Sequence, residues 1–566
     1  MSISLATVSG VASTNATMLD WFARNTIASV VTTKSIQVEA NPGNREPILT
    51  EASPGSFGNA VGLRNPGLEA TVRELTALQN LRRRDPWPRG TVLNISLAGD
   101  TPEAFAHLAR ALAPLGEMLE LNFSCPHARG HYGSAIGADP DAVEMYTRAV
   151  VRECGATPVY VKLTPNTDRI AEIAVRAVGA GAAGLVAINT ADPQVYTEPH
   201  SGASILSNPP EGRGGKSGRW IRERAVECVT TVRQAVGGDL PIIGMGGVES
   251  HHQALALIEA GATVVGVGSA LARVHQQQWP AFLEEIARGE RKQPGEGYSL
   301  RGSAGMRFRP ARVVHREELD ERLFEVDIAL EGDGASLEYR SGQVCFLWIP
   351  GVGEKPFSPA GSAPLRFLVA RRGPFTEALG RMTPGERIFV RGPYGTPMPA
   401  GRTSPHNDNA VARGPAASVP PRALIIAGGS GMALLPSLVR ELCAASFAVT
   451  ALVGLRDGKT RQPLQRDTEL YRLGTVSCVA DEGTPGRVLD AIEPAVADRL
   501  YLIGPEPFMK EGLRRALAAG YRRDQVTVSL EQSMLCGVGL CGACHNRGIL
   551  TCHSGTLVSA EQWEDK

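Results

Sequence analysis

Eight short apolar runs, rich in β-branched residues, alternate with longer helical patterns over roughly the first 270 residues of this chain. The runs are LATVS, which ends at Ser9, ASVVTTK (to Lys34), TVLNIS (to Ser96), MLELN (to Asn122), VYVK (to Lys162), GLVAIN (to Asn189), PIIGMGG (to Gly247) and TVVGVGS (to Ser269). Strands that alternate with helices form a parallel sheet, and eight such units close a barrel. The sequence therefore predicts an α/β fold that begins with a (β/α)8 TIM barrel.

The helical pattern after the third run is typical of the repeat. Thr101 is placed to cap a helix, Pro102 stands at its first position, and Phe105, Leu108 and Leu112 share one face. We therefore expect a helix that begins here and packs this apolar face against the barrel.

Polar residues and glycines end the eight runs. In barrels of this kind the chemistry takes place at the C-terminal ends of the strands. Turns also favour such residues, so a single one carries little weight. Two lysines and two asparagines at one edge indicate a functional site. The predicted set is Ser9, Lys34, Ser96, Asn122, Lys162, Asn189, Gly246, Gly247, Gly268 and Ser269.

The pattern changes twice beyond residue 300. Short alternating strands over 301–396 predict a small antiparallel β-barrel, and 397–421 is a linker rich in proline, glycine, alanine and polar residues. The buried run RALIIAGG then opens an α/β sheet domain over 422–525, followed by a cysteine-bearing tail at 526–566. With the N-terminal barrel over 1–295, we expect four domains and one linker.

Four of the ten cysteines lie close together in the tail, as Cys536-x4-Cys541-x2-Cys544-x7-Cys552. Glycines between them let the backbone wrap closely and direct N–H groups toward bridging sulfurs. The first three spacings match plant-type [2Fe–2S] ligands. The alternative, a structural zinc site, usually consists of two separated Cys-x2-Cys knuckles. We therefore predict an iron–sulfur cluster held by these four cysteines.

A glycine turn follows the strand RALIIA, and a second glycine ends a later strand. The turn contains Gly428, Gly429 and Gly431 and could place a helix N-terminus against a pyrophosphate, although a plain strand-to-helix turn would look similar. Gly504 and Pro505 leave a shallow platform for a flat ring. Together these five residues predict a nicotinamide nucleotide site.

Charge and composition exclude several classes of partner. Lys and Arg number 58, as do Asp and Glu, so no overall positive field favours nucleic acid or an anionic membrane surface. No apolar run approaches the roughly 20 residues that span a bilayer, and the N-terminal segment lacks a basic region followed by an apolar stretch. We expect small-molecule partners and a cytoplasmic location.

The C-terminal part, 301–566, resembles the electron-transfer subunit of class 1B dihydroorotate dehydrogenase, a relative of ferredoxin reductases. The resemblance depends on the ordered stretches LWIPGVGEKPFS, ARRGPFTEAL, RGPYG, LIIAGGSG, LIGPEPFMK and MLCGVGLCGAC. It implies FAD, NAD and [2Fe–2S] sites in that order. The family's Arg-Pro-x-Ser flavin motif reads Lys355-Pro356-Phe357-Ser358 here, so a point charge replaces a bidentate fork. The implied FAD contacts are these four residues with Gly373, Pro374 and Thr376.

The N-terminal part, 1–290, resembles the catalytic subunit of the same family. The matching stretches are TTKS, GNAVGLRNPG, LELNFSCP, VKLTPN, AINT, GGKSG, IIGMGG and VGVGSAL. The whole chain therefore resembles a class 1B dihydroorotate dehydrogenase in which the two subunits are fused, the segment around 290–305 acting as the joint. The resemblance also implies a homodimer formed through the barrel.

The resemblance assigns roles at the strand ends. It implies that Cys125 is the base that takes a proton from the substrate, because an exposed thiolate near positive charge is a competent base. It also implies that Lys162 places a cation at the flavin's N1/O2 edge, where negative charge accumulates on reduction. The implied substrate contacts are Lys34, Asn59, Gly62, Leu63, Asn122, His127, Asn189 and Thr190. The implied FMN contacts are Ser9, Lys34, Ser96, Asn122, Lys162, Ile188, Gly218, Gly246, Gly247, Gly268 and Ser269.

One departure from the family concerns the substrate. The family's Ser-Cys-Pro-Asn reads Ser124-Cys125-Pro126-His127, which resembles dihydropyrimidine dehydrogenase, an enzyme of uracil and thymine. A neutral His127 would offer the ligand one hydrogen-bond donor and one acceptor. Alternatively, His127 packs within the loop without contacting the ligand. Lys34 favours orotate, because a cation that awaits a carboxylate has no partner on a neutral ring.

The expected activity is oxidation of dihydroorotate to orotate, with electrons passed through FMN, the [2Fe–2S] cluster and FAD to NAD+. One alternative is a pyrimidine reductase that acts on uracil or a modified pyrimidine with a nicotinamide donor. Another is an electron carrier whose barrel is not catalytic, which Cys125, Lys162 and the asparagines together disfavour. The direction in the cell, NAD against NADP and the oligomeric state stay open at this point.

Overall fold

The computed structural model divides the chain into two compact units. Unit 1 comprises Met1–Arg301 with Val538–Ala543, and unit 2 comprises Gly302–Gly537 with Cys544–Lys566. The residues that the structure describes are 2–123, 134–206, 212–290, 305–332, 336–398, 420–455, 467–480, 487–494 and 496–563. Each unit is described separately below.

Eight parallel strands of unit 1 close into a barrel in the order β1-β12-β11-β8-β7-β6-β5-β2. They are β1 (Leu5–Thr7), β2 (Ala28–Thr32), β5 (Val92–Leu97), β6 (Met118–Asn122), β7 (Val159–Leu163), β8 (Gly184–Ala187), β11 (Ile242–Met245) and β12 (Val264–Val267). Each lies within one of the eight predicted runs or ends one residue beyond it. The predicted TIM barrel is confirmed.

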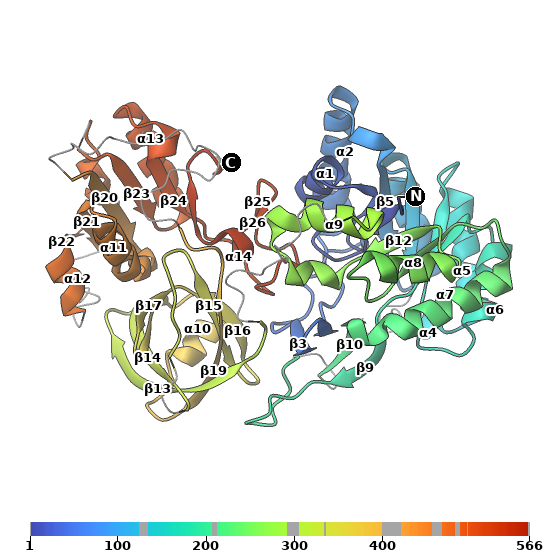
Figure 1. Cartoon of the computed structure of the whole chain (residues 1–566), viewed down its shortest axis with the longest axis horizontal. Helices are drawn as coiled ribbons and strands as arrows, with labels where there is room; N and C mark the ends of the chain where they lie inside the picture. Colours follow the sequence, from blue (N-terminus) through green and yellow to red (C-terminus); the bar gives the residue numbers. More distant parts are fainter. Residues whose placement is uncertain are drawn as a thin grey trace. The chain divides into compact units, whose positions relative to one another are not determined.

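Helices surround the barrel strands, as Figure 1 shows. They are α1 (Ala16–Asn25), α2 (Leu68–Arg84), α3 (Pro102–Leu112), α4 (Ser134–Gly137), α5 (Pro140–Glu153), α6 (Ile170–Gly179), α7 (Arg222–Val236), α8 (His251–Glu259) and α9 (Trp279–Arg288). Helix α3 begins as expected, because the Thr101 side chain accepts a hydrogen bond from the Ala104 N–H. Its Phe105, Leu108 and Leu112 are fully buried. The apolar face predicted from their spacing therefore packs inward.

A four-stranded antiparallel sheet, β3-β4-β10-β9, accompanies the barrel and was not predicted. It joins β3 (Leu49–Ser53) and β4 (Ser56–Asn59), which follow β2, to β9 (Ala191–Val195) and β10 (Arg213–Gly218), which follow β8. Loops that follow barrel strands lie at the C-terminal ends of those strands. The extra sheet therefore belongs to the edge of the barrel where the site is expected.

Apolar side chains fill part of the barrel interior. Ala6, Val30, Met118, Val186 and Ile243 form one buried cluster with Met245. Side chains two residues apart on a strand share a face, so Glu120 and Asn122 point to the same side of β6 as Met118. The interior therefore changes from apolar to polar toward the C-terminal ends of the strands.

Unit 2 begins with a seven-stranded antiparallel sheet in the order β16-β15-β19-β13-β14-β18-β17. Its elements are β13 (Arg309–Glu318), β14 (Leu323–Leu330), β15 (Val344–Ile349), β16 (Gly353–Phe357), β17 (Pro359–Ser362), β18 (Leu365–Ala370), helix α10 (Pro374–Leu379) and β19 (Arg387–Tyr394). The predicted antiparallel strands are present. Among the described residues the pairing gives a sheet with β16 and β17 at its edges, where the sequence predicted a barrel.

A six-stranded sheet, β22-β21-β20-β23-β24-β27, follows in unit 2. Its strands are β20 (Arg422–Gly428), β21 (Ala448–Leu455), β22 (Thr475–Ala480), β23 (Arg499–Ile503), β24 (Val526–Ser529) and β27 (Leu557–Ser559). The helices of this part are α11 (Leu435–Ala444), α12 (Thr468–Leu473), α13 (Glu506–Ala518) and α14 (Thr551–Ser554), and β25 (His545–Asn546) pairs with β26 (Ile549–Leu550) in a separate two-stranded sheet. Strands β24 and β27 come from the tail, so two strands of this six-stranded sheet flank the cysteine segment in the sequence.

The turn after β20 leads first into a short 3₁₀ helix and then into an α-helix. Residues Gly429–Leu434 form a 3₁₀ helix, and α11 begins only at Leu435. Pro436 lies in the first turn of α11, where its missing N–H costs no hydrogen bond. The α-helix therefore starts where proline is tolerated.

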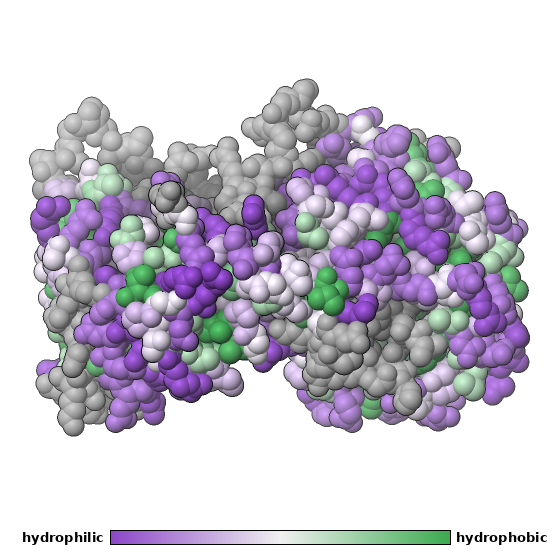
Figure 2. Space-filling view, turned by 90° about the horizontal axis from the view of Figure 1, so that it is seen from below, coloured by the Kyte–Doolittle hydropathy of each residue, from purple (hydrophilic) through white to green (hydrophobic). Residues whose placement is uncertain are grey.

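Hydrophilic side chains cover most of the described surface on the face in Figure 2, and apolar residues form small separate patches. Leu81, Met145 and Val175 are among the large apolar side chains that are exposed. Among the described residues, no helix combines the length and apolar character needed to cross a membrane.

Candidate active site

A buried hydrogen-bond network joins the predicted residues at the C-terminal ends of β1, β2, β5 and β6. The Ser35 hydroxyl lies 3.1 Å from the Ser9 hydroxyl and 2.9 Å from that of Ser96. The Asn122 amide donates to the same Ser35 oxygen over 2.8 Å. Ser35, which the sequence analysis did not select, is thus the common partner of three predicted residues.

Lys162 has a carboxylate partner inside the barrel. Its Nζ lies 3.5 Å from Glu120 Oε1, and that oxygen also accepts a 3.0 Å hydrogen bond from the Ser96 hydroxyl. Only 5% of the Lys162 side chain and 1% of the Glu120 side chain are exposed. A buried cation needs such a counter-charge, because the desolvation cost of an isolated ammonium is large. Glu120 therefore holds Lys162 in place as a charged group.

Two asparagines bond to each other at neighbouring strand ends. Asn189 donates from Nδ2 to Asn122 Oδ1 over 3.1 Å, and Asn189 Oδ1 accepts from the Thr190 N–H at 2.8 Å. Asn59, on the extra sheet, donates to Ser217 and to the Gly215 carbonyl. These contacts fix the orientation of the amides that the sequence assigned to the substrate.

Glycines at the ends of β10 and β11 leave room for a close backbone approach. A Cβ on Gly218 would lie 2.1 Å from the Gly55 carbonyl oxygen, and one on Gly247 would lie 2.7 Å from the Gly218 oxygen. Both have positive φ values, 91° and 69°, which favour glycine. Gly246, Gly268 and Ser269 lie at the neighbouring ends of β11 and β12, and the buried Ile188 follows β8. Glycine at positions 218 and 247 therefore lets the chain's own backbone pack closely at the edge that carries the predicted FMN contacts.

Two of the implied substrate contacts, Gly62 and Leu63, help to line a cavity of about 470 Å³. Gln37, Asn41 and Asn44, from the segment between β2 and β3, also line the cavity. It is therefore a polar opening next to the strand-end network.

Lys34 follows β2 and is half-buried. Burial, with a smaller contribution from Arg64, lowers the pKa of Lys34 to about 8, and the Cys541 thiol partly offsets this decrease. Lys34 thus carries its positive charge near neutral pH and loses it in moderately alkaline solution.

Cys125 and His127, the predicted base and its unusual neighbour, lie outside the described residues, which resume at residue 134. Their roles stay predictions from the sequence.

The predicted FAD residues lie on β16 and around α10 of unit 2. Lys355, Pro356 and Phe357 belong to β16, and Ser358 follows directly. Phe357 stacks with Phe375 of α10 at 6.0 Å between ring centroids. These contacts bring the two halves of the predicted FAD set together.

Gly373 and Pro374 begin α10, and the hydroxyl of Thr376 bonds within the same turn. It accepts from the Arg372 N–H at 2.8 Å and from the Gly373 N–H at 3.1 Å. Thr376 therefore organises the turn that carries the glycine.

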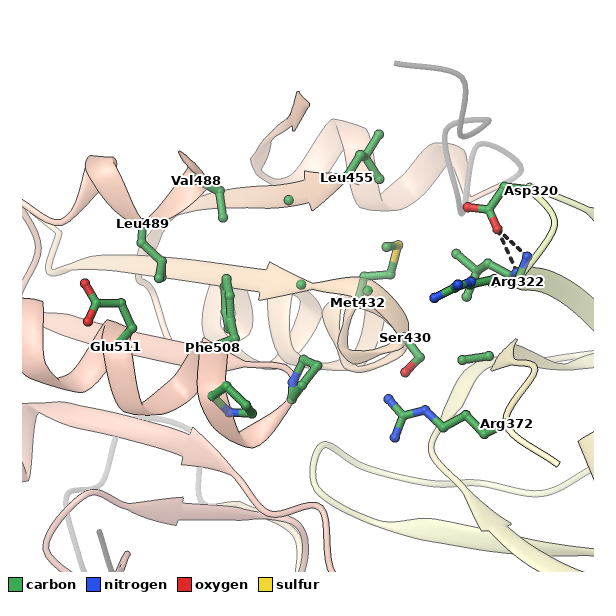
Figure 3. Close-up of a pocket in the computed structure, with 17 residues that line it drawn as sticks. Asp320, Arg322, Arg372, Ser430, Met432, Leu455, Val488, Leu489, Phe508 and Glu511 are labelled. Atoms are coloured by element: carbon green, nitrogen blue, oxygen red, sulfur yellow. Dashed lines mark hydrogen bonds between the residues drawn. The ribbon is translucent and has the colours of Figure 1, made fainter. Parts of the chain in front are cut away.

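Three of the five predicted nucleotide residues line a cavity of about 480 Å³ in unit 2, namely Gly428, Gly429 and Pro505. Arg322 and Arg372 lie at one end of this cavity, and Leu489, Phe508 and Glu511 lie toward the other (Figure 3). One end can thus meet a diphosphate and the other an aromatic base.

Two of the predicted glycines, Gly428 and Gly504, pack against the aromatic ring of Phe508. A Cβ on Gly504 would lie 2.9 Å from the Phe508 ring, and one on Gly428 would lie 3.4 Å from it. Gly431 does not line the cavity. A Cβ there would lie 2.9 Å from the Ile503 carbonyl oxygen, so its glycine permits close packing of the 3₁₀ helix on β23.

Three cysteines of the tail converge within unit 2. Cys536, Cys544 and Cys552 are almost fully buried, and the Cys552 N–H lies 3.4 Å from the Cys544 sulfur. Hydrogen bonding to Cys536 and Cys544, with burial, raises the pKa of Cys552. Thiolates packed this closely repel one another, so the donor set suits a cationic iron centre.

Cys541, the fourth predicted ligand, belongs to the segment Val538–Ala543 that is grouped with the barrel. There the Leu540 carbonyl accepts from the Ala12 N–H at 2.7 Å, and Thr14 donates to the Gly542 carbonyl. Among the described residues, no group of three or more His, Cys, Asp or Glu side chains is arranged to hold a metal ion. Neither unit by itself contains all four thiols.

A comparison with protein families decides the relationship. The family model described as dihydroorotate dehydrogenase matches residues 3–288. The chain belongs to the dihydroorotate dehydrogenase family. It is accordingly an enzyme of the oxidoreductase class.

Similar curated proteins in this family carry the name dihydroorotate dehydrogenase B (NAD(+)), catalytic subunit. The protein of Methanothermobacter thermautotrophicus is 37% identical over 273 residues, which are 48% of this chain and 84% of that protein. That of Methanocaldococcus jannaschii is 39% identical over 243 residues, 43% of this chain and 75% of the relative. A dihydroorotate dehydrogenase crystallised with ferulenol, from Eimeria tenella, has 21% identity and a TM-score of 0.41, covering 50% of this chain and 79% of its own.

Sequence reasoning missed Glu120, a buried carboxylate that contacts both Ser96 and Lys162 in this candidate site. The signal was available, because Glu120 and Asn122 are two residues apart on one strand and must share a face. Register places Glu120 beside Ser96 and Asn122 beside Lys162. Alternation within β6 therefore puts both polar residues inside the barrel.

Proposed function

We propose that this dihydroorotate dehydrogenase family member oxidises dihydroorotate to orotate and passes the electrons through FMN, a [2Fe–2S] cluster and FAD to NAD+. The observation that carries the proposal is the set of buried Ser96, Glu120, Asn122 and Lys162 with the half-buried Asn189 at one edge of the barrel. The names of the similar catalytic subunits support the substrate and the final acceptor. The chain would thus combine in one polypeptide what those relatives divide between subunits.

The proposed chemistry divides into two transfers. Oxidation of a dihydropyrimidine removes a proton from one ring carbon and a hydride from its neighbour, and a bound flavin accepts the hydride. Cys125 is the proposed base for the proton. Lys162, held by Glu120, places a positive charge where the flavin becomes negative. Asn122 and Asn189 offer fixed amide donors and acceptors to the pyrimidine.

The second unit supports the proposed electron route. The strand β16 and helix α10 would hold FAD, and the cavity beside Gly428 and Pro505 would hold the nicotinamide nucleotide. The four tail cysteines would hold the cluster, which supplies one-electron transfer between two flavins. A homodimer through the barrel and a cytoplasmic location belong to the same proposal.

A second candidate substrate is uracil or a modified pyrimidine. It is favoured by His127, which stands where the family has asparagine. A titration of the flavin separates the two candidates. Under anaerobic conditions we expect dihydroorotate to bleach the flavin absorbance and dihydrouracil to leave it unchanged. Bleaching by dihydrouracil alone would transfer the assignment to the second candidate.

We expect the affinity for dihydroorotate to fall in alkaline solution because of Lys34. Its pKa is about 8, so deprotonation above this pH removes the cation that would bind the substrate carboxylate. KM should rise about five-fold between pH 8 and pH 9, following the protonated fraction. Lys34→Arg stays charged throughout and should show no such rise in steady-state assays. Identical pH profiles for the two proteins would contradict a role for Lys34.

Glu120→Gln is expected to make the FMN easier to reduce. The substitution keeps the side chain's shape and removes the negative charge beside Lys162, so the cation stabilises reduced flavin by on the order of 1 kcal/mol more. Reductive titration against a reference dye measures this shift. Glu284→Gln, in the surface pair with Arg288, is the control and should leave the potential unchanged. An unshifted potential in Glu120→Gln would separate Glu120 from the flavin.

A further inference from the structure

A buried arginine of the seven-stranded sheet contacts the first cysteine of the tail. Arg391 is 1% exposed and donates from Nη1 to the Cys536 carbonyl over 2.8 Å. The same Nη1 lies 2.9 Å from the Tyr394 hydroxyl, which donates to the Gly305 carbonyl at 2.6 Å. Nε and Nη2 form a bidentate pair with Glu354, which is fully buried. The guanidinium thus joins a strand, a carboxylate and the cysteine segment.

The surroundings of this guanidinium are built to keep it in place. Its plane lies over the Phe346 ring, 4.1 Å from the centroid, where cation–π attraction adds to the ion pair. Gly537 has a φ of 82°, and a Cβ there would lie 3.1 Å from Nη1. The residue after Cys536 is therefore one that allows Arg391 to reach the carbonyl. Burial of a full charge pair for fold stability alone is a weak explanation, since apolar residues often serve as well.

The same arginine connects the cysteine to the predicted flavin strand. Glu354 lies on β16 immediately before Lys355, the first residue of the predicted FAD motif. Strand β15 lies between β16 and β19 and pairs with both, so Glu354 and Arg391 meet across it. One hydrogen-bonded chain therefore runs from β16 through Arg391 to Cys536.

We propose that Arg391 is a positioning residue for Cys536 and thereby determines the assembly and reduction potential of the iron–sulfur cluster. The inference rests on the proposed function, which assigns Cys536 as a cluster ligand. Arg391 holds the carbonyl of Cys536 and so fixes the peptide plane that follows it. That plane sets the direction of the cysteine side chain and of the N–H groups in the glycine-rich turn. The positive charge close to the ligand also favours the reduced, more negative cluster.

The test compares variants of the full-length protein. Arg391→Met removes the donors and the charge while keeping an unbranched side chain. Arg391→Met combined with Glu354→Gln also removes the unpaired carboxylate, which protects the fold. The matched control is Arg366→Met, since Arg366 pairs with Asp327 in the same sheet at 2.9 Å and does not contact a tail cysteine among the described residues. Readouts are iron and acid-labile sulfide per chain, the electron paramagnetic resonance signal of the reduced cluster, its midpoint potential and FAD absorbance.

We expect both Arg391 variants to lose iron affinity on the order of ten-fold, as is typical for outer-shell partners of metal ligands. Cluster that remains should have a lower midpoint potential and an altered resonance signal. FAD content and the Arg366→Met protein should stay near wild type. Full iron content with an unchanged potential in the double variant would overturn the inference while leaving the proposed function intact. Wild-type protein without iron and sulfide would overturn the proposed function and this inference with it.

Discussion

Cys125→Ala is expected to abolish reduction of the flavin by dihydroorotate while NADH still reduces FAD. Loss of the proposed base should slow the substrate half-reaction about 10³-fold, the middle of the range for general acid–base catalysis. The second half-reaction should persist, because the predicted nucleotide cavity lies in unit 2. Anaerobic stopped-flow absorbance measures both half-reactions separately.

Cys228→Ala is the matched control for this prediction. Cys228 is buried on α7 of the barrel unit and has no proposed chemical role. Dihydroorotate should therefore bleach the flavin of the Cys228→Ala variant at the wild-type rate. Cys125→Ser should retain part of the activity, since a serine hydroxyl is also able to take part in proton transfer when a neighbouring group activates it. Rapid bleaching by dihydroorotate in Cys125→Ala would assign proton removal to another group.

Cys541→Ser is expected to eliminate coupled turnover from dihydroorotate to NAD+ without stopping either half-reaction. Without a complete set of thiolates the cluster is lost, and two separated flavins then have no one-electron relay. Dihydroorotate should still bleach FMN, and NADH should still reduce FAD. The measurement combines steady-state NADH formation with the two anaerobic titrations and the iron content.

Cys443→Ser is the control for the tail cysteines, because Cys443 lies on α11 and outside the predicted cluster set. It should keep both its iron and its coupled turnover. Coupled turnover in an iron-free Cys541→Ser protein would remove the cluster from the electron route.

Local patterns in the sequence determined the barrel. The eight apolar runs contain the starts of all eight strands, and Thr101 caps α3 as its spacing indicated. These features depend on neighbours within a few residues, so periodicity and capping chemistry reveal them. Predicted residues such as Asn122 and Lys162 meet at one edge because parallel strands all end there.

Only the tertiary structure decided which distant residues became partners. Asn59 bonds to Gly215, 156 positions away, through a sheet of which no strand was predicted. Arg391 reaches Glu354 across 37 positions and Cys536 across 145. A short polar strand such as β10 has no distinctive periodicity. The sequence also does not distinguish a buried charged residue from an exposed one. Contacts between residues so far apart in the sequence form only when whole strands and helices pack together. The entropy cost of closing the long intervening loop must be met before such contacts lower the free energy.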